Sequence, residues 1–453
     1  MKKKDIIKNK AICPMPFNHS YIGPTYERRL CCISKNIYSD KINLEDYWNS
    51  DKMKKIRMDM VQGTRVSECE VCYKLEDSNI ESYREKSLAH DIEVGDEHTW
   101  LTEESATKGI ASLPTHFDYR TIHCNLACNH CGSAFSSEHL KQRSIQQKNS
   151  HMQDKGLSFK IDKDFEETML NDLIKAVDER RLTRIYFAGG EPMMSLLHWK
   201  FLEHAKKAHD TDPDFIKNMN VYYNTNLTKT KWKQNDAYEA IKFLNPKVHA
   251  SLDGVGNTFN YIRRGADWEQ VVKNFNSAHK ALVDSNNPKF NFGVQPVILS
   301  HNIFSMDEML SFFEKYEGIE IQPLSLLRNF PNEYHYNPHP GFLDPCEFPS
   351  EIMIPAIDVA IERVERSTVS GSNAIIPILE NYKIDIAAHR KNNEKLQFKS
   401  YAATKHMETL SSLTLNSLLK EINTPAWIWY NSICDKYRDA DISTHKLFDN
   451  LDL

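Results

Sequence analysis

Three cysteines lie close together in the run Ile122–Gly132, at Cys124, Cys128 and Cys131. Cysteine thiolates at such spacing are the ligands that hold iron–sulfur clusters. A cluster of four irons that receives only three cysteines keeps one iron open for a small chelating ligand, as an open position separates catalytic from structural metal sites. The spacing therefore predicts a cluster that takes part in chemistry.

Two other interpretations compete for these cysteines. They could belong to a zinc site with His123 or His130 as a fourth ligand, or they could form disulfides in a secreted protein. The N-terminal run Met1–Lys10 is charged and no apolar segment follows it, so no signal peptide is predicted and we expect a cytoplasmic protein. Disulfides are rare in that compartment, so the spacing favours iron–sulfur and leaves zinc open.

The composition is that of an ordinary soluble protein. The chain has 453 residues, a formal charge of −5 and 40% hydrophobic residues, which fits two or three domains. The small net charge indicates no nucleic-acid partner, and no apolar run is long enough to cross a membrane. Eight of the ten cysteines lie before residue 132, and we expect the other two, Cys346 and Cys434, to be inert.

The middle of the chain alternates short apolar runs with longer amphipathic ones. Helical spacing is clear at Phe165–Val177, Trp268–Val283 and Met306–Tyr316. The predicted strands are Thr115–Ile122, Arg184–Ala188, Asn220–Asn224, Lys247–Leu252, Asn291–Val297 and Ile319–Leu324. Strands separated by helices of this length indicate parallel βαβ units, and six of them fit a partial or full β/α barrel better than an open sheet.

Polar or glycine-rich residues follow these strands at their carboxyl ends. The first strand leads into the cysteine loop, the second into Gly189–Pro192, and the third into Asn224–Asn226. The next two lead into Ser251–Gly254 and Ser300–Asn302. Because β/α barrels build their active sites at this end, the pattern predicts one assembled site.

The Cys-x3-Cys-x2-Cys loop after a first strand, with Gly-Gly-Glu-Pro after the second, resembles the radical S-adenosylmethionine (radical SAM) superfamily over residues 112–330. The resemblance implies a partial (β/α)6 barrel and a [4Fe–4S] cluster on Cys124, Cys128 and Cys131. It also implies that S-adenosylmethionine chelates the open iron and is cleaved reductively to a 5′-deoxyadenosyl radical. That radical would take a hydrogen atom from a substrate, and a flavodoxin or ferredoxin would supply the electron.

The same resemblance implies roles for the other strand-end residues. Gly189 and Gly190 would let the backbone approach the cofactor, Pro192 would belong to the same cofactor-binding loop, and Glu191 would accept hydrogen bonds from the methionine ammonium. Ser251, Asp253 and Asn226 would contact the ribose, Arg263 or Arg264 the methionine carboxylate, and His130 the adenine.

Ordinary structural roles compete with these. Glu191 could interact with a helix N-terminus, and Asp253 could serve turn geometry. Arg263, Arg264 and His130 could lie at the surface.

A second cysteine set precedes the barrel: Cys13, the pair Cys31 and Cys32, and then Cys69 and Cys72. Four such ligands can hold either zinc or a cluster. The arrangement resembles the Twitch or SPASM-type auxiliary modules of radical SAM enzymes, although in most relatives that module follows the barrel. The resemblance implies a second [4Fe–4S] cluster on Cys13, Cys69, Cys72 and one of the paired cysteines, for which we favour Cys31.

The predicted organisation has four parts. Residues 1–80 form an auxiliary cluster domain, 81–111 a linker, 112–330 the core barrel, and 331–453 a mainly helical extension. The leading hypothesis is an oxidoreductase or maturase that acts on a peptide or a small metabolite, with its catalytic acid, base or hydrogen donor unassigned. The alternative is a non-catalytic iron–sulfur or zinc protein that serves structure or electron relay.

Overall fold

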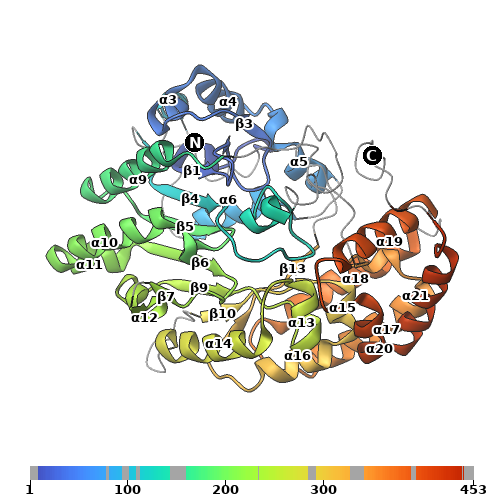
Figure 1. The fold of residues 1–453 in the computed structure, drawn as a ribbon. Helices are drawn as coiled ribbons and strands as arrows, with labels where there is room; N and C mark the ends of the chain where they lie inside the picture. Colours follow the sequence, from blue (N-terminus) through green and yellow to red (C-terminus); the bar gives the residue numbers. More distant parts are fainter. Residues whose placement is uncertain are drawn as a thin grey trace. The chain divides into compact units, whose positions relative to one another are not determined.

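The chain has an α/β fold in which most strand pairs are parallel (Figure 1). A computed structural model describes residues 9–77, 81–93, 102–108, 113–142, 160–232, 234–283, 292–326, 341–388, 394–440 and 442. It divides into a first unit (Met1–Ile122, Leu157–Tyr223 and Phe243–Pro246) and a second unit (His123–Gly156, Asn224–Lys242 and Lys247–Leu453). None of the helices described is long and apolar enough to cross a membrane.

The first unit is built on a sheet. Strand β4 (His116–Thr121) pairs in parallel with β1 (His19–Ile22) and β5 (Arg184–Gly189), and β5 pairs with β6 (Asn220–Thr225). Strands β2 (Arg28–Arg29) and β3 (Asn36–Tyr38) continue antiparallel beyond β1. The helices of this unit are α2 (Met15–Asn18), α3 (Leu44–Asn49), α4 (Asp51–Val61), α5 (Glu70–Asp77), α6 (Tyr83–Glu93), α7 (Glu103–Lys108), α9 (Lys163–Asp178), α10 (Leu196–Thr211) and α11 (Pro213–Asn218).

Local sequence explains where the helices of this unit begin. The Asp162 carboxylate accepts the Asp164 and Phe165 N–H groups and so caps α9, and Ser195 caps α10 in the same way. Helix α9 buries Met169, Leu170 and Leu173, which lie at helical spacing, and it packs against α10. In Figure 1 these helices lie together on one side of the strands.

The second unit contains parallel strands followed by helices. Strand β10 (Phe292–Val294) pairs in parallel with β9 (Lys247–Ala250) and β12 (Glu320–Ile321). The short strands are β7 (Lys231–Trp232), β8 (Asn235–Asp236), β11 (Val297–Ile298) and β13 (Leu324–Ser325). The helices are α12 (Ala237–Ile241), α13 (Gly256–Ile262), α14 (Trp268–Leu282), α15 (Ser300–Phe304), α16 (Met306–Phe313), α17 (Ser350–Glu365), α18 (Ile375–Ala388), α19 (Glu394–Glu408), α20 (Leu415–Ile422) and α21 (Thr424–Lys436).

The alternation predicted for the middle of the chain is confirmed. Strands β4, β5, β6 and β9 begin within a residue of their predicted starts, whereas the fifth and sixth predicted strands are each divided in two. Helices α17 to α21 follow the strands and lie together in Figure 1. The predicted linker, residues 81–111, contains α6 and α7.

Candidate functional site

The loop that carries Cys124, Cys128 and Cys131 follows β4 and is closed by serine hydroxyls. The Cys124 N–H donates to Ser137 Oγ at 3.0 Å, and that hydroxyl donates to the Cys124 carbonyl at 2.9 Å. Cys124 and Cys128 are buried and Cys131 is half-buried. The sequence therefore forms a compact loop with its three thiols largely shielded from water.

This loop is docked along the end of α13 by backbone hydrogen bonds. The Ala127 N–H donates to the Arg264 carbonyl at 3.0 Å, and the Asn129 N–H donates to the Ile262 carbonyl at 2.8 Å. The Asn129 side chain adds a hydrogen bond from Nδ2 to the Tyr261 carbonyl at 2.7 Å. These contacts fix the cysteine loop against the segment that bears Arg263 and Arg264.

The three cysteines pack together in one cluster with Leu126. Burial raises the pKa of Cys128 to about 12, an effect that Arg263 opposes and Cys131 increases. Burial also raises the pKa of Cys131 to about 12, and Cys124 adds to it. Only a bound metal makes such thiols thiolates near neutral pH.

This donor set fits an iron–sulfur cluster. Within the described residues, no group of three or more Cys, His, Asp or Glu side chains has the spacing of ligands around one metal ion. A cluster places its cysteines on separate irons, so it does not need that spacing.

A glycine is required at position 189 because the backbone of the neighbouring strand β4 leaves no room for a side chain. Its φ is +99°, and a Cβ there would lie 2.5 Å from the Thr121 carbonyl oxygen. The next residue, Gly190, donates its N–H to the same oxygen at 2.6 Å. The close approach that the sequence predicts at this loop is therefore an approach to the neighbouring strand; an approach to a cofactor stays a prediction.

Glu191 is fully buried, and its Oε1 accepts the Met193 N–H at 3.0 Å. It thus caps the 3₁₀ turn Pro192–Met194, which is the structural role that the sequence left open. Its predicted contact with the methionine ammonium stays a prediction.

Asp253 joins residues from three of the predicted loops. Its Oδ1 accepts the Val297 N–H at 2.8 Å. Its Oδ2 lies 2.7 Å from Arg263 Nε and 3.7 Å from His130 Nε2. Burial opposes the charge of Arg263, but Asp253 together with Cys128 and Cys131 raises the pKa of the guanidinium above its ordinary value. Asp253 and Arg263, predicted to contact different parts of a cofactor, are paired with each other.

Asn226 and Ser251 both lie in the second unit. Asn226 Nδ2 lies 3.4 Å from Asn125 Oδ1 and 3.8 Å from Cys124 Sγ, which places this predicted ribose contact at the cysteine loop. The Ser251 N–H donates to the Thr225 carbonyl at 2.9 Å. Arg264 donates to Asn129 Oδ1 at 3.3 Å and to Gln142 Oε1 at 2.6 Å, so it supports the loop.

Sequence reasoning missed Asn129 and His139. His139 Nε2 lies 2.9 Å from the Cys128 carbonyl oxygen, and burial lowers the pKa of this imidazole to about 4. The neutral ring can therefore donate to that carbonyl. Asn129 could have been suspected from its place between two cysteines, whereas nothing in the sequence singles out His139.

Comparison with protein families agrees with this site. Residues 119–311 match the radical SAM superfamily. The matched segment runs from β4 into α16 and contains all three cysteines of the loop, although it is less than half of the chain. A comparison with curated proteins gives no match.

Several solved structures resemble the chain at low identity. The structure of native anSMEcpe with bound AdoMet and the Kp18Cys peptide is 17% identical, with a TM-score of 0.36, over 55% of this chain and 60% of that chain. The chain thus spans less than two thirds of that protein's length. Streptococcus suis SuiB bound to its precursor peptide SuiA is 11% identical, with a TM-score of 0.32, over 70% of this chain and 65% of that chain. TM-scores this low do not establish a shared fold.

The N-terminal cysteines lie outside the radical SAM segment. Cys13, Cys31, Cys69 and Cys72 are buried and Cys32 is half-buried, and none of the ten cysteines forms a disulfide. Burial raises the pKa of Cys31, and Cys32, Cys69 and Cys13 raise it further. For Cys32, burial raises the pKa to about 11, and the next influences are Arg120 and Asp118. Cys31 is therefore near Cys32, Cys69 and Cys13, whereas Cys32 is near Arg120 and Asp118 of β4 and also near Cys72.

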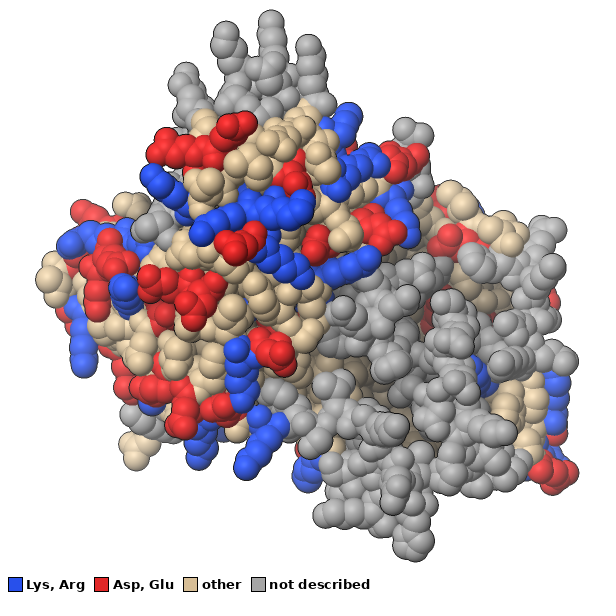
Figure 2. Space-filling model, turned by 90° about the horizontal axis from the view of Figure 1, so that it is seen from above, with Lys and Arg blue, Asp and Glu red and all other residues tan. Residues whose placement is uncertain are grey.

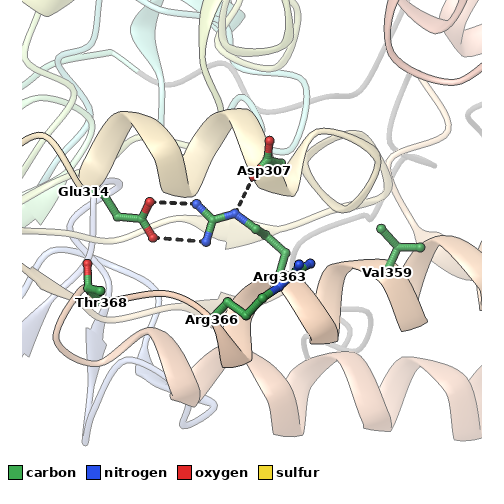
Figure 3. Close-up of a pocket in the computed structure, with 6 residues that line it drawn as sticks. All are labelled: Asp307, Glu314, Val359, Arg363, Arg366 and Thr368. Carbon is green, nitrogen blue, oxygen red and sulfur yellow. Dashed lines mark hydrogen bonds and ion pairs between the residues drawn. The ribbon is translucent and has the colours of Figure 1, made fainter.

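A surface hollow of about 620 Å³ in the second unit contains none of the predicted residues (Figure 3). Arg363 of α17 crosses it and pairs with Asp307 and with Glu314, whose Oε2 lies 2.8 Å from its Nη2. The guanidinium thus links α17 to α16 through its ion pairs. This hollow is a helix–helix seam and not a candidate site.

Proposed function

We propose that the chain is a radical SAM enzyme whose [4Fe–4S] cluster is held by Cys124, Cys128 and Cys131. The observation that carries the proposal is the match of residues 119–311, within which these three shielded cysteines pack together in one cluster. When bound, the cluster with S-adenosylmethionine supplies reductive cleavage of the sulfonium and hydrogen abstraction from a substrate. The reductant is proposed to be a flavodoxin or ferredoxin.

The chain's own residues are proposed to hold the cysteine loop, to bind and orient the cofactor, and to shield it from water. Backbone hydrogen bonds to Arg264 and Ile262 hold the cysteine loop, and Asn226 lies against Cys124. We assign Asn226 and Ser251 to the ribose and Glu191 to the methionine ammonium. The buried Arg263–Asp253 pair lies beside His130. It joins the Ser251–Gly254 segment to the end of α13 and excludes water there.

The N-terminal cysteines are proposed to hold an auxiliary [4Fe–4S] cluster on Cys13, Cys31, Cys69 and Cys72. Their fit is supported by burial, by the influence of Cys69 and Cys13 on the pKa of Cys31, and by that of Cys13 and Cys72 on the pKa of Cys69. Such a cluster suits an oxidative outcome, since it can accept an electron from a substrate radical. Zinc on the same thiols is the alternative.

The substrate is proposed to be a peptide or a small metabolite. One face of the first unit's parallel sheet carries Asp118, Arg120, Tyr186 and Tyr21, although parallel sheets are ordinarily apolar on both faces. Arg120 Nε lies 2.6 Å from Asp118 Oδ1, and its guanidinium lies 4.5 Å from the Tyr186 ring centroid. In Figure 2 acidic and basic residues are mixed over the described part of the visible face.

Anaerobic reconstitution with iron and sulfide, followed by S-adenosylmethionine and a strong reductant, tests the proposal. We expect about eight irons per chain from two [4Fe–4S] clusters, and 5′-deoxyadenosine as a product even without substrate. A protein that binds a cluster and yields no 5′-deoxyadenosine would instead be an electron-relay protein. Zinc at both cysteine sets would indicate a structural protein.

Glu191→Gln tests the cofactor assignment, because it keeps a carbonyl acceptor and removes the charge. A hydrogen bond to a charged group contributes roughly 1.5–3 kcal/mol, so affinity for S-adenosylmethionine should fall about 10- to 150-fold in isothermal titration. Iron content should not change. Unchanged affinity with a lowered melting temperature would limit Glu191 to its role as the cap of Pro192–Met194.

A further inference from the structure

A buried ion pair ties together two of the segments that carry the N-terminal cysteines. Arg84, at the start of α6, pairs with Glu76 on α5 through Nε–Oε1 at 2.8 Å and Nη2–Oε2 at 2.6 Å. The side chains are only 4% and 6% exposed. Removing two charges from water costs several kcal/mol per ion, so such a pair is poor evidence for stability alone.

The third arm of the same guanidinium reaches the first cysteine segment. Arg84 Nη1 donates to the Ile12 carbonyl at 2.8 Å, and Ile12 immediately precedes Cys13. Glu76 lies one helical turn after Cys72 on α5. A planar, rigid fork is suited to hold two partners at once in this way.

The start of α6 also contacts the thiol of Cys72. Burial raises the pKa of Cys72, and the Arg84 backbone N–H and the Ser82 hydroxyl oppose that shift by hydrogen bonding. The Ser82 hydroxyl also donates to Glu76 Oε1 at 2.6 Å. Thus residues 82–84, in a segment that the sequence marked only as a linker, touch the segments of Cys13 and Cys72.

We propose that Arg84 is a positioning residue that holds the Cys13 and Cys72 segments in the arrangement that binds a metal group. This inference rests on the proposed metal site of the N-terminal cysteines. Residues around metal ligands typically alter metal affinity or activity about 10- to 100-fold when they are changed. Arg84 acts through Ile12 and Glu76 and ligates nothing itself.

The test uses the full chain with Cys124, Cys128 and Cys131 replaced by alanine, so that all bound metal belongs to the N-terminal cysteines. In this background, Arg84→Lys keeps the charge beside Glu76 but cannot bridge Glu76 and the Ile12 carbonyl together. We expect a chelator to remove iron from the reconstituted variant about 10- to 100-fold faster than from the background protein. The absorption and electron paramagnetic resonance spectra of the remaining cluster should also change.

The chain offers a control in Arg180, which pairs with Asp212 through two nitrogens at 3.0 Å and 2.7 Å. This pair is exposed, at 63% and 34%, and belongs to segments that carry none of the N-terminal cysteines. Arg180→Lys should therefore leave metal retention and spectra unchanged. The double variant Glu76→Gln/Arg84→Met removes both buried charges and should fold, yet lose iron as fast as Arg84→Lys.

Three results would overturn the inference. The first is metal retention in Arg84→Lys equal to that in Arg180→Lys. The second is a melting temperature of metal-free Arg84→Lys so low that metal loss simply follows unfolding. The third is a background protein that takes up neither iron nor zinc, which removes the site itself. In that last case S-adenosylmethionine cleavage by the chain with its cysteine loop intact still decides the proposed function separately.

Discussion

The cysteine loop after β4 is fixed by main-chain hydrogen bonds as well as side chains, whereas the contacts described around the N-terminal cysteines come from side chains. Ala127 and Asn129 donate their N–H groups to carbonyls at the end of α13, and the side chains of Ser137 and Asn129 add further hydrogen bonds. Around Cys13 and Cys72 the contacts come from the Arg84 guanidinium and from Tyr73, whose hydroxyl donates to the Ala11 carbonyl at 3.1 Å. The main-chain bonds of the first arrangement persist when a side chain is replaced, and the side-chain contacts of the second do not.

The largest difference between the two sets should appear when their cysteines are removed. Replacing any of Cys124, Cys128 or Cys131 by alanine should abolish 5′-deoxyadenosine formation, because the open iron no longer exists. Replacing Cys13, Cys69 and Cys72 together should halve the iron, from about eight to about four per chain, and keep some cleavage. Iron analysis and product chromatography measure both, and a triple variant that keeps all its iron would contradict the auxiliary cluster.

The sequence was sufficient for the elements that repeat and for the residues that bear chemistry. Short apolar runs predicted β4, β5 and β6, and helical spacing predicted α9, because burial of an element selects apolar residues at the positions that face the core. The division of the fifth strand into β10 and β11 was not predictable, since Pro296 interrupts an otherwise apolar run without showing where pairing resumes.

Which side chains pair with one another could not be read from the sequence. Asp253 and Arg263 were each recognised as site candidates, but only the fold shows that the carboxylate and the guanidinium lie 2.7 Å apart. Arg84 sits in a segment that resembles a solvated linker, and its burial depends on Glu76 and Ile12 reaching it from other elements. Pairing of this kind is a property of tertiary structure and leaves no period in the sequence.

Breaking the buried Arg263–Asp253 ion pair beside the cysteine loop should lower the free energy of unfolding substantially. Asp253→Asn leaves the Arg263 guanidinium buried without its counter-charge, so the free energy of unfolding should fall by about 3–5 kcal/mol. Asp212→Asn is the control, because the Arg180–Asp212 pair is exposed and should contribute at most about 1 kcal/mol. Urea denaturation measures both; equal small losses would mean that water reaches Arg263.

Acid should weaken both units through buried neutral histidines. Burial lowers the pKa of His198, in the first unit, from its ordinary 6.5 to about 3, and lowers that of His301, in the second, to about 3. The unfolded chain therefore takes up protons below pH 6.5 that the folded chain refuses, so stability is complete above that pH and falls as pH decreases. Each histidine should cost about 2 kcal/mol between pH 6.5 and pH 5.

His198→Gln isolates one of these contributions. The amide can still reach the Tyr223 hydroxyl, which lies 3.0 Å from His198 Nε2, but it takes up no proton. Urea midpoints of the variant should therefore decrease less between pH 7 and pH 5 than those of the unaltered chain. An unchanged pH dependence would show that His198 is not responsible for acid sensitivity in the first unit.

The smallest effect on bound metal should come from replacing Cys32, which lies next to the proposed ligand Cys31 but is not proposed as a ligand itself. Cys31 is influenced by Cys69 and Cys13, whereas Cys32 is influenced first by Arg120 and Asp118 after burial itself. Cys31→Ala should remove the metal of the N-terminal set, and Cys32→Ala should leave it in place. Iron content after reconstitution, in the background without Cys124, Cys128 and Cys131, separates the two. The opposite result would place Cys32 among the ligands and turn the metal group toward β4, which would make Arg120 and not Arg84 its nearest cation.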